Sequence, residues 1–353
     1  MRTRSSHQIT FDLQQLPLDA QLSLRDTLID ALAIYAAGPR VVQTQLCLSL
    51  AALALQLPES HWPNVVPGMI DRFGKSPDTV NVLLEFLSVL PEEVAQNHRI
   101  PVSNATYHER MPQLLTQQAT VVLELLSMYI RADGVTTSIQ ETIFHCLRSW
   151  LKAGEVSANQ LAATPLLPLT FEALESDALF DVAVDVLCDL IHETQEIDEN
   201  QAVIQMLLPR IQALRPALVQ AGDDEDRVRG LCRIFVQAGE TYHTLFLQHT
   251  NELLPIVQAI LECASYHDLD IVQITFRFWY LLATHVHKAA AEHNPAVVPF
   301  REVYEQLFAI IIRHLHFKSV THRVIFFCSE ACKKVELSSC SGFLRPHNGI
   351  NSI

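Results

Sequence analysis

Residues 140–151 read Gln140-Glu141-Thr142-Ile143-Phe144-His145-Cys146-Leu147-Arg148-Ser149-Trp150-Leu151, with apolar side chains at steps of three and four residues. This spacing places them on one face of an α-helix and predicts that the face is buried. Stretches with a similarly dense apolar face begin near residues 44, 80, 181, 227 and 271. From residue 140 onward they start 41, 46 and 44 residues apart, within the roughly 40–47-residue period of two-helix HEAT or armadillo repeats.

The same helical spacing extends along most of the chain, with breaks at proline, glycine or small polar clusters. It predicts helices near 19–36, 39–57, 60–73, 78–94, 106–131, 136–153, 158–174, 178–194, 199–220, 224–247, 250–265, 269–289 and 297–316. Only residues 324–327 have strand character, and they lack an obvious partner strand. We therefore expect an all-α fold, a right-handed superhelical solenoid of HEAT-type helix pairs (armadillo-like), with a compact helical bundle as the alternative.

The composition limits both the fold and the partners. Of 353 residues, 49% are hydrophobic and only 10 are glycine. The chain can therefore bury a large core but has few of the turn residues that many-stranded β-folds need. The formal net charge is −14, which argues against direct nucleic-acid binding, since nucleic-acid-binding proteins present basic surfaces to phosphates. Basic protein partners fit this charge better.

Secretion and membrane signals are not visible in the sequence. The first residues are polar and do not form the apolar core of a signal peptide, and the longest uncharged run, residues 41–58, is too polar for a membrane span. The first five of the 8 cysteines lie singly and far apart within helical patterns, which argues against a disulfide framework and for a reducing compartment. We expect no membrane association.

No motif for nucleotide or hydrolase chemistry is present, because the glycines form no Gly-x-Gly turn, Gly-x-Ser-x-Gly elbow or Gly-Lys-Ser/Thr loop. We expect no catalytic residues, no cofactor and no metal. Two histidine pairs, His285/His287 and His314/His316, have a two-residue spacing that points the rings to different faces of a helix. A further set of possible metal ligands is Cys328, Cys332 and Cys340, with His322 and His347 nearby. Its spacing matches no zinc-finger pattern, and a zinc enzyme built on it is the least favoured hypothesis.

The acidic residues are concentrated between Glu155 and Asp226, where the only basic residues are Arg210 and Arg215. Asp181, Asp185, Asp189 and Glu193 are spaced by four, so they line one face of one helix. A second group is the run Asp223-Asp224-Glu225-Asp226. These eight residues are the candidate partner-binding residues, and a solvated face without a ligand is the alternative. Trp150, Phe278 and Trp279 lie in apolar helical patterns and are expected to pack in the core.

Several segments resemble one known family in the same order along the chain. They are residues 43–56, the run Leu83 to Val94 with its Leu-Pro-Glu-Glu element, Cys146-Leu147-Arg148-Ser149-Trp150, Cys232-Arg233-Ile234-Phe235, and Thr275-Phe276-Arg277-Phe278-Trp279-Tyr280. This pattern resembles the karyopherin-β (importin-β) superfamily, in particular its transportin-SR (transportin 3) branch. The resemblance covers about residues 13–317.

The resemblance implies a nuclear import receptor without catalytic activity. Such a receptor shuttles between cytoplasm and nucleus, passes the nuclear pore through contacts with Phe-Gly nucleoporins, and releases its cargo on binding Ran-GTP. The cargo of this branch is arginine/serine-rich or other RNA-binding protein. An acidic receptor surface facing basic cargo agrees with charge steering and charge-assisted hydrogen bonding.

Compared with the family, residues 1–317 resemble an interior slice of a longer HEAT array. The helices that make much of the Ran contact would precede Met1, so we expect Ran-GTP binding by this chain to be reduced or lost. Residues 318–353 diverge from the family, lose the helical period and are expected to be a poorly ordered tail. The alternative function is a HEAT-repeat scaffold that holds a protein complex without binding Ran or nucleoporins.

Overall fold

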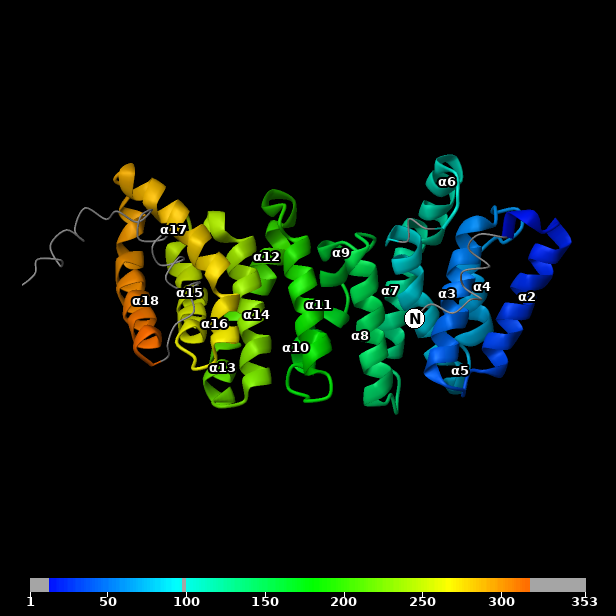
Figure 1. Ribbon diagram of the computed structural model, residues 1–353, viewed down its shortest axis with the longest axis horizontal. Helices are drawn as coiled ribbons and strands as arrows, with labels where there is room; N and C mark the ends of the chain where they lie inside the picture. The colour runs from blue at the N-terminus through cyan, green and yellow to red at the C-terminus, as the bar shows by residue number, and fades with distance from the viewer. Residues whose placement is uncertain (1–12, 97–99, 318–353) are drawn as a thin grey trace, which may run out of the picture. The chain divides into compact units, whose positions relative to one another are not determined.

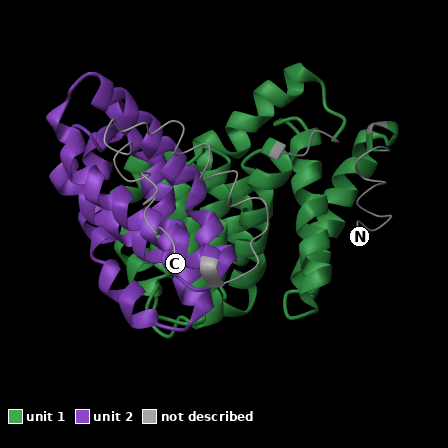
Figure 2. Ribbon diagram, turned by 60° about the vertical axis from the view of Figure 1, so that its left-hand side comes forward, with its two compact units in different colours: residues 1–196 green, residues 197–353 purple. Residues whose placement is uncertain are grey.

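The computed structural model describes residues 13–96 and 100–317, and these residues form helices and no strands (Figure 1). The all-α prediction is confirmed for this part of the chain. The tail at 318–353 and the cluster of Cys328, Cys332 and Cys340 lie outside the described residues. The chain divides into two compact units, residues 1–196 and 197–353 (Figure 2). The division between a repeat array at 1–317 and a separate tail stays a prediction.

The first unit contains two kinds of helices that alternate along the chain. Its elements are η1 (Leu13–Gln15), α2 (Leu18–Ile34), α3 (Arg40–Gln56), α4 (Val65–Phe73), α5 (Pro77–Pro91), the π-helical turn η2 (Glu92–Gln96), α6 (Asn104–Leu114), η3 (Thr116–Gln118), α7 (Ala119–Tyr129), α8 (Thr137–Lys152), α9 (Ala158–Ala162), α10 (Leu166–Ala173) and α11 (Phe180–Glu193). Helices α3, α5, α8 and α11 pack against one another in that order. Helices α2, α4, α7 and α10 pack on α3, α5, α8 and α11 respectively, so the unit has two layers.

The second unit is built around α14. Its elements are α12 (Ile197–Gln212), α13 (Arg215–Ala221), α14 (Glu225–Thr241), η4 (His243–Leu245), α15 (Thr250–Ala264), α16 (Leu269–Ile274), α17 (Phe276–Ala291), η5 (Pro295–Val297) and α18 (Val298–Phe317). Helix α14 packs against α13, α15, α16 and α17. Its backbone approaches α17 closely at Gly239, where an added Cβ would lie 2.6 Å from the Phe278 ring. Phe278 and Trp279 are buried, as the sequence predicted.

The predicted helices agree with the observed ones where the apolar period continues without interruption. The predictions at 39–57, 136–153 and 178–194 agree with α3, α8 and α11 to within two residues at each end. The single helix predicted at 106–131 is wrong, because η3 separates α6 from α7. The one predicted at 269–289 is also divided, at Thr275. The Thr275 hydroxyl donates to the Val272 carbonyl oxygen at 2.7 Å, a local side-chain bond that competes with continuation of the helix.

Pro91 decides how α5 meets α8. A proline inside a helix has no N–H to donate to the carbonyl four residues earlier, which here is the carbonyl of Leu87. The indole Nε1 of Trp150, fully buried on α8, donates to this oxygen at 2.9 Å. The Glu92 N–H bonds to the carbonyl of Val89 at the start of the π-helical turn. It therefore does not donate to the Ser88 carbonyl, which would be its partner in a regular α-helix.

The Ser88 carbonyl oxygen accepts a hydrogen bond from the Ser149 hydroxyl, also on α8. Two neighbouring carbonyls of α5 are therefore satisfied by two neighbouring side chains of α8. The two carbonyls belong to the run Leu83 to Val94 and the two side chains to the Cys146–Trp150 segment, two separate stretches that resemble the family. The contact between α5 and α8 brings these two sequence segments together.

Replacing Trp150 by Phe tests this contact. Trp150→Phe keeps an aromatic ring but leaves the buried Leu87 carbonyl without a donor, so we expect the free energy of unfolding to fall by about 1–3 kcal/mol. In a Pro91→Ala background the backbone at position 91 regains an N–H that can donate within the helix, and Trp150→Phe should then cost less. Urea denaturation of the four proteins in this double-mutant cycle measures the difference. If Trp150→Phe lowered the free energy of unfolding equally in both backgrounds, Trp150 would not be replacing the hydrogen bond that Pro91 cannot make.

Candidate partner-binding surfaces

The first group of predicted residues lies on α11. Its apolar residues, among them Val184 and Leu187, are buried, and α11 packs on α8 and α10. The structure brings the four acids of the predicted row onto this one helix, at successive turns: Asp181, Asp185, Asp189 and Glu193. Asp181 lies in the first turn and is exposed, where a negative charge is favourable beside the positive end of the helix dipole.

The two central acids of the row bind Arg148 of α8. The Arg148 Nη1 lies 2.5 Å from an Asp185 carboxylate oxygen, and its Nε lies 2.8 Å from one of Asp189. All three side chains are only about a quarter exposed, at 26%, 22% and 24%. The guanidinium offers donors in a fixed planar arrangement, which suits two carboxylates one helical turn apart. Asp185 and Asp189 therefore hold α11 to α8, and much of their charge is already compensated.

Glu193 ends the row in a half-buried position. Burial raises the pKa of its carboxyl group, the His192 side chain opposes this shift, and the charge of Asp189 adds to it. A carboxylate that is costly to ionise is a weaker attraction for a basic ligand than an exposed one. Within the row, Asp181 is the acid best placed to meet a partner.

The second group, Asp223 to Asp226, lies at the start of α14 and is exposed at all four positions. Asp224 caps the helix by accepting a hydrogen bond from the Arg227 N–H at 3.1 Å. A carboxylate of Asp226 lies 3.6 Å from Arg229 on the same helix. We call Asp223, Asp224, Glu225 and Asp226 the α14 acidic surface.

The turn between α15 and α16 lies beside this surface. His267 Nε2 is 3.5 Å from a Glu225 carboxylate oxygen, which makes an ion pair when the ring is protonated. Desolvation raises the pKa of the Tyr266 hydroxyl, and the charges of Glu225 and Asp223 raise it further. The negative field of the α14 acidic surface thus extends over this turn. The row on α11 and the surface on α14 belong to different compact units, and each is described by itself.

The role of Arg148 is not among the predictions from the sequence, although the repeat period contains a signal for it. Arg148 and Asp189 are 41 residues apart, which is one step of the repeat. The same separation joins α3 to α5, where the Thr44 hydroxyl donates to a carboxylate oxygen of Glu85 at 2.5 Å. In a repeat array, residues one period apart face each other across neighbouring helices. Opposite charges at that separation therefore predict pairing between repeats.

Neither a metal-binding group nor a membrane-spanning helix is found among the described residues. Within residues 13–96 and 100–317, no three His, Cys, Asp or Glu side chains are grouped so that they could hold a metal ion. His285 packs on the ring of His243, with centroids 4.9 Å apart, and His314 donates to the Ala264 carbonyl oxygen. No described helix combines the length and apolar character needed to cross a membrane.

Two family models match parts of this chain. Residues 39–187 match the family described as "Exportin 1-like protein", and residues 223–314 match "Transportin-3/Importin-13 second TPR domain". An uncharacterized protein of Schizosaccharomyces pombe is 34% identical over 315 residues, which are 88% of this chain and 32% of that protein. Transportin MOS14 of Arabidopsis thaliana is 28% identical over 320 residues, 85% of this chain and 33% of that protein. The chain belongs to the karyopherin-β family.

A solved structure described as "Importin13 cytosolic state" resembles this karyopherin chain with a TM-score of 0.65 and 16% identity, over 90% of this chain and 41% of that one. The likeness confirms the predicted all-α array of HEAT-type helix pairs. The karyopherin chain spans about a third of the length of the curated relatives it matches. The relatives with functional names, a transportin and an importin, are transport receptors and not enzymes, and the sequence contains no motif for nucleotide or hydrolase chemistry.

Removing Arg148 tests its position between α8 and α11. Arg148→Met removes the guanidinium that bridges Asp185 and Asp189, so we expect the free energy of unfolding to fall by about 1–2 kcal/mol, between the values for exposed and buried ion pairs. Adding Asp185→Asn and Asp189→Asn to this variant should restore part of the loss. Urea denaturation measures both effects.

The matched control is Arg301→Met, because Arg301 pairs with Glu305 on one exposed helix face at 3.0 Å. Its cost should stay below about 0.5 kcal/mol. If Arg148→Met cost no more than this control, the contact between α8 and α11 would not depend on the arginine.

Proposed function

We propose that this karyopherin chain is part of a nuclear import receptor that binds basic protein cargo, of the arginine/serine-rich or other RNA-binding kind. The observation that supports this most directly is the α14 acidic surface, four consecutive acids that are all exposed. The proposal also rests on the family, whose members matched here include a transportin and an importin.

The proposal rests on two properties of charged side chains: they attract opposite charges over long distances, and they form directional hydrogen bonds. Exposed carboxylates attract a basic ligand from a distance and then accept charge-assisted hydrogen bonds from its guanidinium groups. Asp223 to Asp226 are all exposed, and their ion pairs are long contacts to His267 and Arg229, whereas Asp185 and Asp189 would have to release the short contacts to Arg148. The α14 acidic surface is therefore the principal cargo contact in this proposal, and Asp181 is a secondary one.

The remaining parts of the proposal concern the transport cycle. The complete receptor would move between cytoplasm and nucleus, contact Phe-Gly nucleoporins in the pore, and release cargo on binding Ran-GTP. Because this chain covers about a third of its relatives' length, its own share of Ran-GTP binding is proposed to be small. No step involves a cofactor or a covalent change.

Neutralising the α14 acidic surface tests cargo binding. The variant with Asp223→Asn, Asp224→Asn, Glu225→Gln and Asp226→Asn removes four charges, and the asparagine side chain at position 224 can still cap the helix. We expect affinity for an arginine/serine-rich peptide to fall by about tenfold at low salt and by less at physiological salt, where charges are screened within about 8 Å. Fluorescence anisotropy at two salt concentrations measures this.

The matched control removes four exposed acids elsewhere by Asp19→Asn, Glu124→Gln, Asp133→Asn and Glu292→Gln. It changes the net charge equally but leaves the α14 acidic surface intact. Peptide binding should therefore be nearly unchanged. A similar loss in both variants would mean that the net charge, and not this surface, attracts the peptide.

Ran-GTP distinguishes the receptor from the scaffold alternative. We expect a form with the full length of the relatives to retain Ran-GTP but not Ran-GDP in a pull-down, and to lose the bound arginine/serine-rich peptide when Ran-GTP is added. This chain by itself should retain less Ran-GTP. If the full-length form bound neither ligand, the scaffold would be the better description.

A further inference from the structure

The second unit contains a pair of histidine rings in contact. His243 lies in η4, directly after α14, and its ring centroid is 4.9 Å from that of His285 in α17. Both side chains are only partly exposed. Histidine is the side chain whose ordinary pKa lies closest to neutral pH. A contact between two such rings makes the junction of η4 and α17 sensitive to protons.

The orientation of His243 is fixed by α14. Its Nδ1 lies 2.6 Å from the backbone carbonyl oxygen of Glu240, so this nitrogen carries a proton and donates it. A second proton on the ring therefore goes to Nε2. Because Nδ1 donates in both the neutral and the charged ring, protonation leaves this hydrogen bond in place and changes the charge beside His285.

One carboxylate balances several cations at this junction. The Glu240 side chain, only 17% exposed, lies 3.4 Å from the Arg277 Nε. Lys288 lies one turn after His285 on α17, and the next acid, Glu292, is exposed and two turns after it. With both rings neutral, Arg277 and Lys288 already outnumber Glu240. Protonation of both rings would add two further positive charges.

The pKa shifts agree with this crowding of positive charge. Burial lowers the pKa of His285 below its ordinary value of 6.5, and the charges of His243 and Lys288 lower it further. Burial raises the pKa of the Glu240 carboxyl, and Arg277 and His243 oppose the rise. A solvated His285 ring binds a proton more readily than the packed one. The packed junction therefore loses stability as the pH falls through 6.5.

The other elements packed on α17 bring no further acid to the ring pair within the described part of the chain. The remaining charged residues of α14 lie at 225–233, two turns or more before Glu240. Asp270 of α16 lies in the first turn of that helix, before α17 begins. Element η5 contains no titratable residue. After η4, His249 lies 3.7 Å from Glu252, so this acid has a partner of its own.

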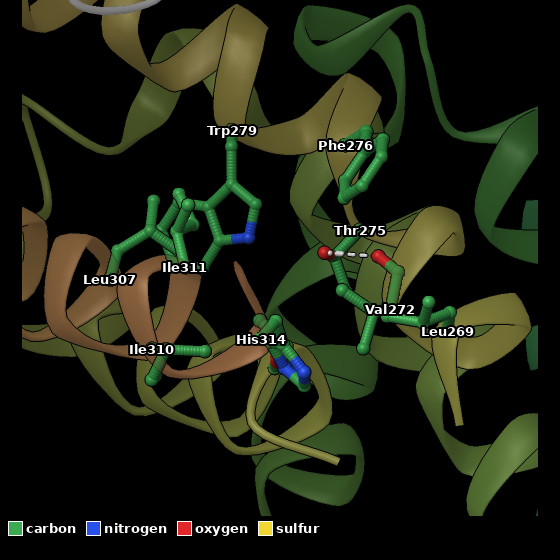
Figure 3. Close-up of a pocket in the computed structure, with 10 residues that line it drawn as sticks. Leu269, Val272, Thr275, Phe276, Trp279, Leu307, Ile310, Ile311 and His314 are labelled. Carbon is green, nitrogen blue, oxygen red and sulfur yellow. Dashed lines mark hydrogen bonds between the residues drawn. The ribbon is translucent and has the colours of Figure 1, made fainter. Parts of the chain in front are cut away.

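The first half of α17 is held by apolar contacts that do not depend on pH. Phe278 packs on Phe246, which directly follows η4, with ring centroids 5.8 Å apart. Figure 3 shows Trp279 beside Leu307 and Ile311 of α18, around a small apolar pocket of about 30 Å³. A change of charge at His285 therefore acts on the second half of the helix.

We propose that the pair of His243 and His285 accepts only one proton while η4 stays packed on α17, and that a second proton separates them. The junction is then a proton-sensitive contact that loosens the end of α17 under mildly acidic conditions. This inference is independent of the cargo and of Ran-GTP.

Titration of the two rings by NMR tests the limit of one proton. The full chain is labelled with ¹³C at histidine Cε1, and single variants assign the two signals. His243→Asn keeps a side-chain N–H for the Glu240 carbonyl but cannot be protonated. The titration midpoint of His285 should then rise by about 0.5–1 pH unit, as expected for two charges about 5 Å apart in largely aqueous surroundings. His285→Asn should raise the midpoint of His243 by a similar amount, because the coupling is mutual.

The matched control is His287→Asn, because His287 lies on α17 but is exposed and two residues away, on another face of the helix. It should leave both midpoints unchanged. If His285 titrated at the same pH with and without His243, or if the control shifted it equally, the proposal would be overturned.

Hydrogen exchange tests the separation itself. After correction for intrinsic rates, amides at 284–291 of α17 should open about three- to tenfold more readily at pH 5.5 than at pH 7.5, the factor that corresponds to 0.5–1 pH unit. His243→Asn should reduce this difference, and α8 serves as a reference that stays closed in both proteins. A pH effect that is absent from the unmodified chain, or that persists in full in His243→Asn, would contradict the proposal.

Discussion

The first unit depends on how α5 is interrupted and then satisfied by α8. Pro91 cannot donate to the Leu87 carbonyl, and the Glu92 N–H bonds to Val89 and not to Ser88, so two neighbouring carbonyls of α5 lose their regular helical donors. Trp150 and Ser149 supply those donors. Because a buried carbonyl without a partner costs more than a hydrogen bond normally contributes, this contact fixes one helix against the next. Apolar packing alone would tolerate several registers of α8 on α5.

The helical period of the sequence predicts the fold but not these polar contacts. Residues 140–151 predict a buried helix face from spacing alone, and α8 agrees to within a residue. The interruptions were harder to predict, because they depend on single residues. The Thr275 hydroxyl bonds to the Val272 carbonyl at the end of α16, and the backbone of Leu115, with φ −118° and ψ −74°, departs from ideal helical angles at the end of α6. Neither residue type is a strong helix breaker, so composition and period do not show where the chain divides.

The sequence predicts where the candidate acidic residues lie, but not which of them are already engaged in ion pairs between helices. Counting acids finds Asp185 and Asp189 as readily as Asp223 and Asp226. What separates them is a cation one repeat away, which becomes visible only when α8 and α11 are side by side. An acidic composition is therefore an upper bound on the charge that a repeat protein offers to a ligand. Part of that charge holds the repeats together.

Arginine carries these contacts between helices in both units. Arg148 binds acids at 185 and 189 of α11, and Arg215 binds Gln258 and Glu262 of α15, in each case acceptors one helical turn apart. Lysine could not replace it, because one ammonium group cannot direct donors to two such acceptors in a fixed plane. The arrangement sets how far each helix can rotate against its neighbour. It also separates two kinds of acid. Asp185 and Asp189, four residues apart and opposite an arginine, hold helices together, whereas the consecutive acids of α14 cannot all face one guanidinium and are exposed.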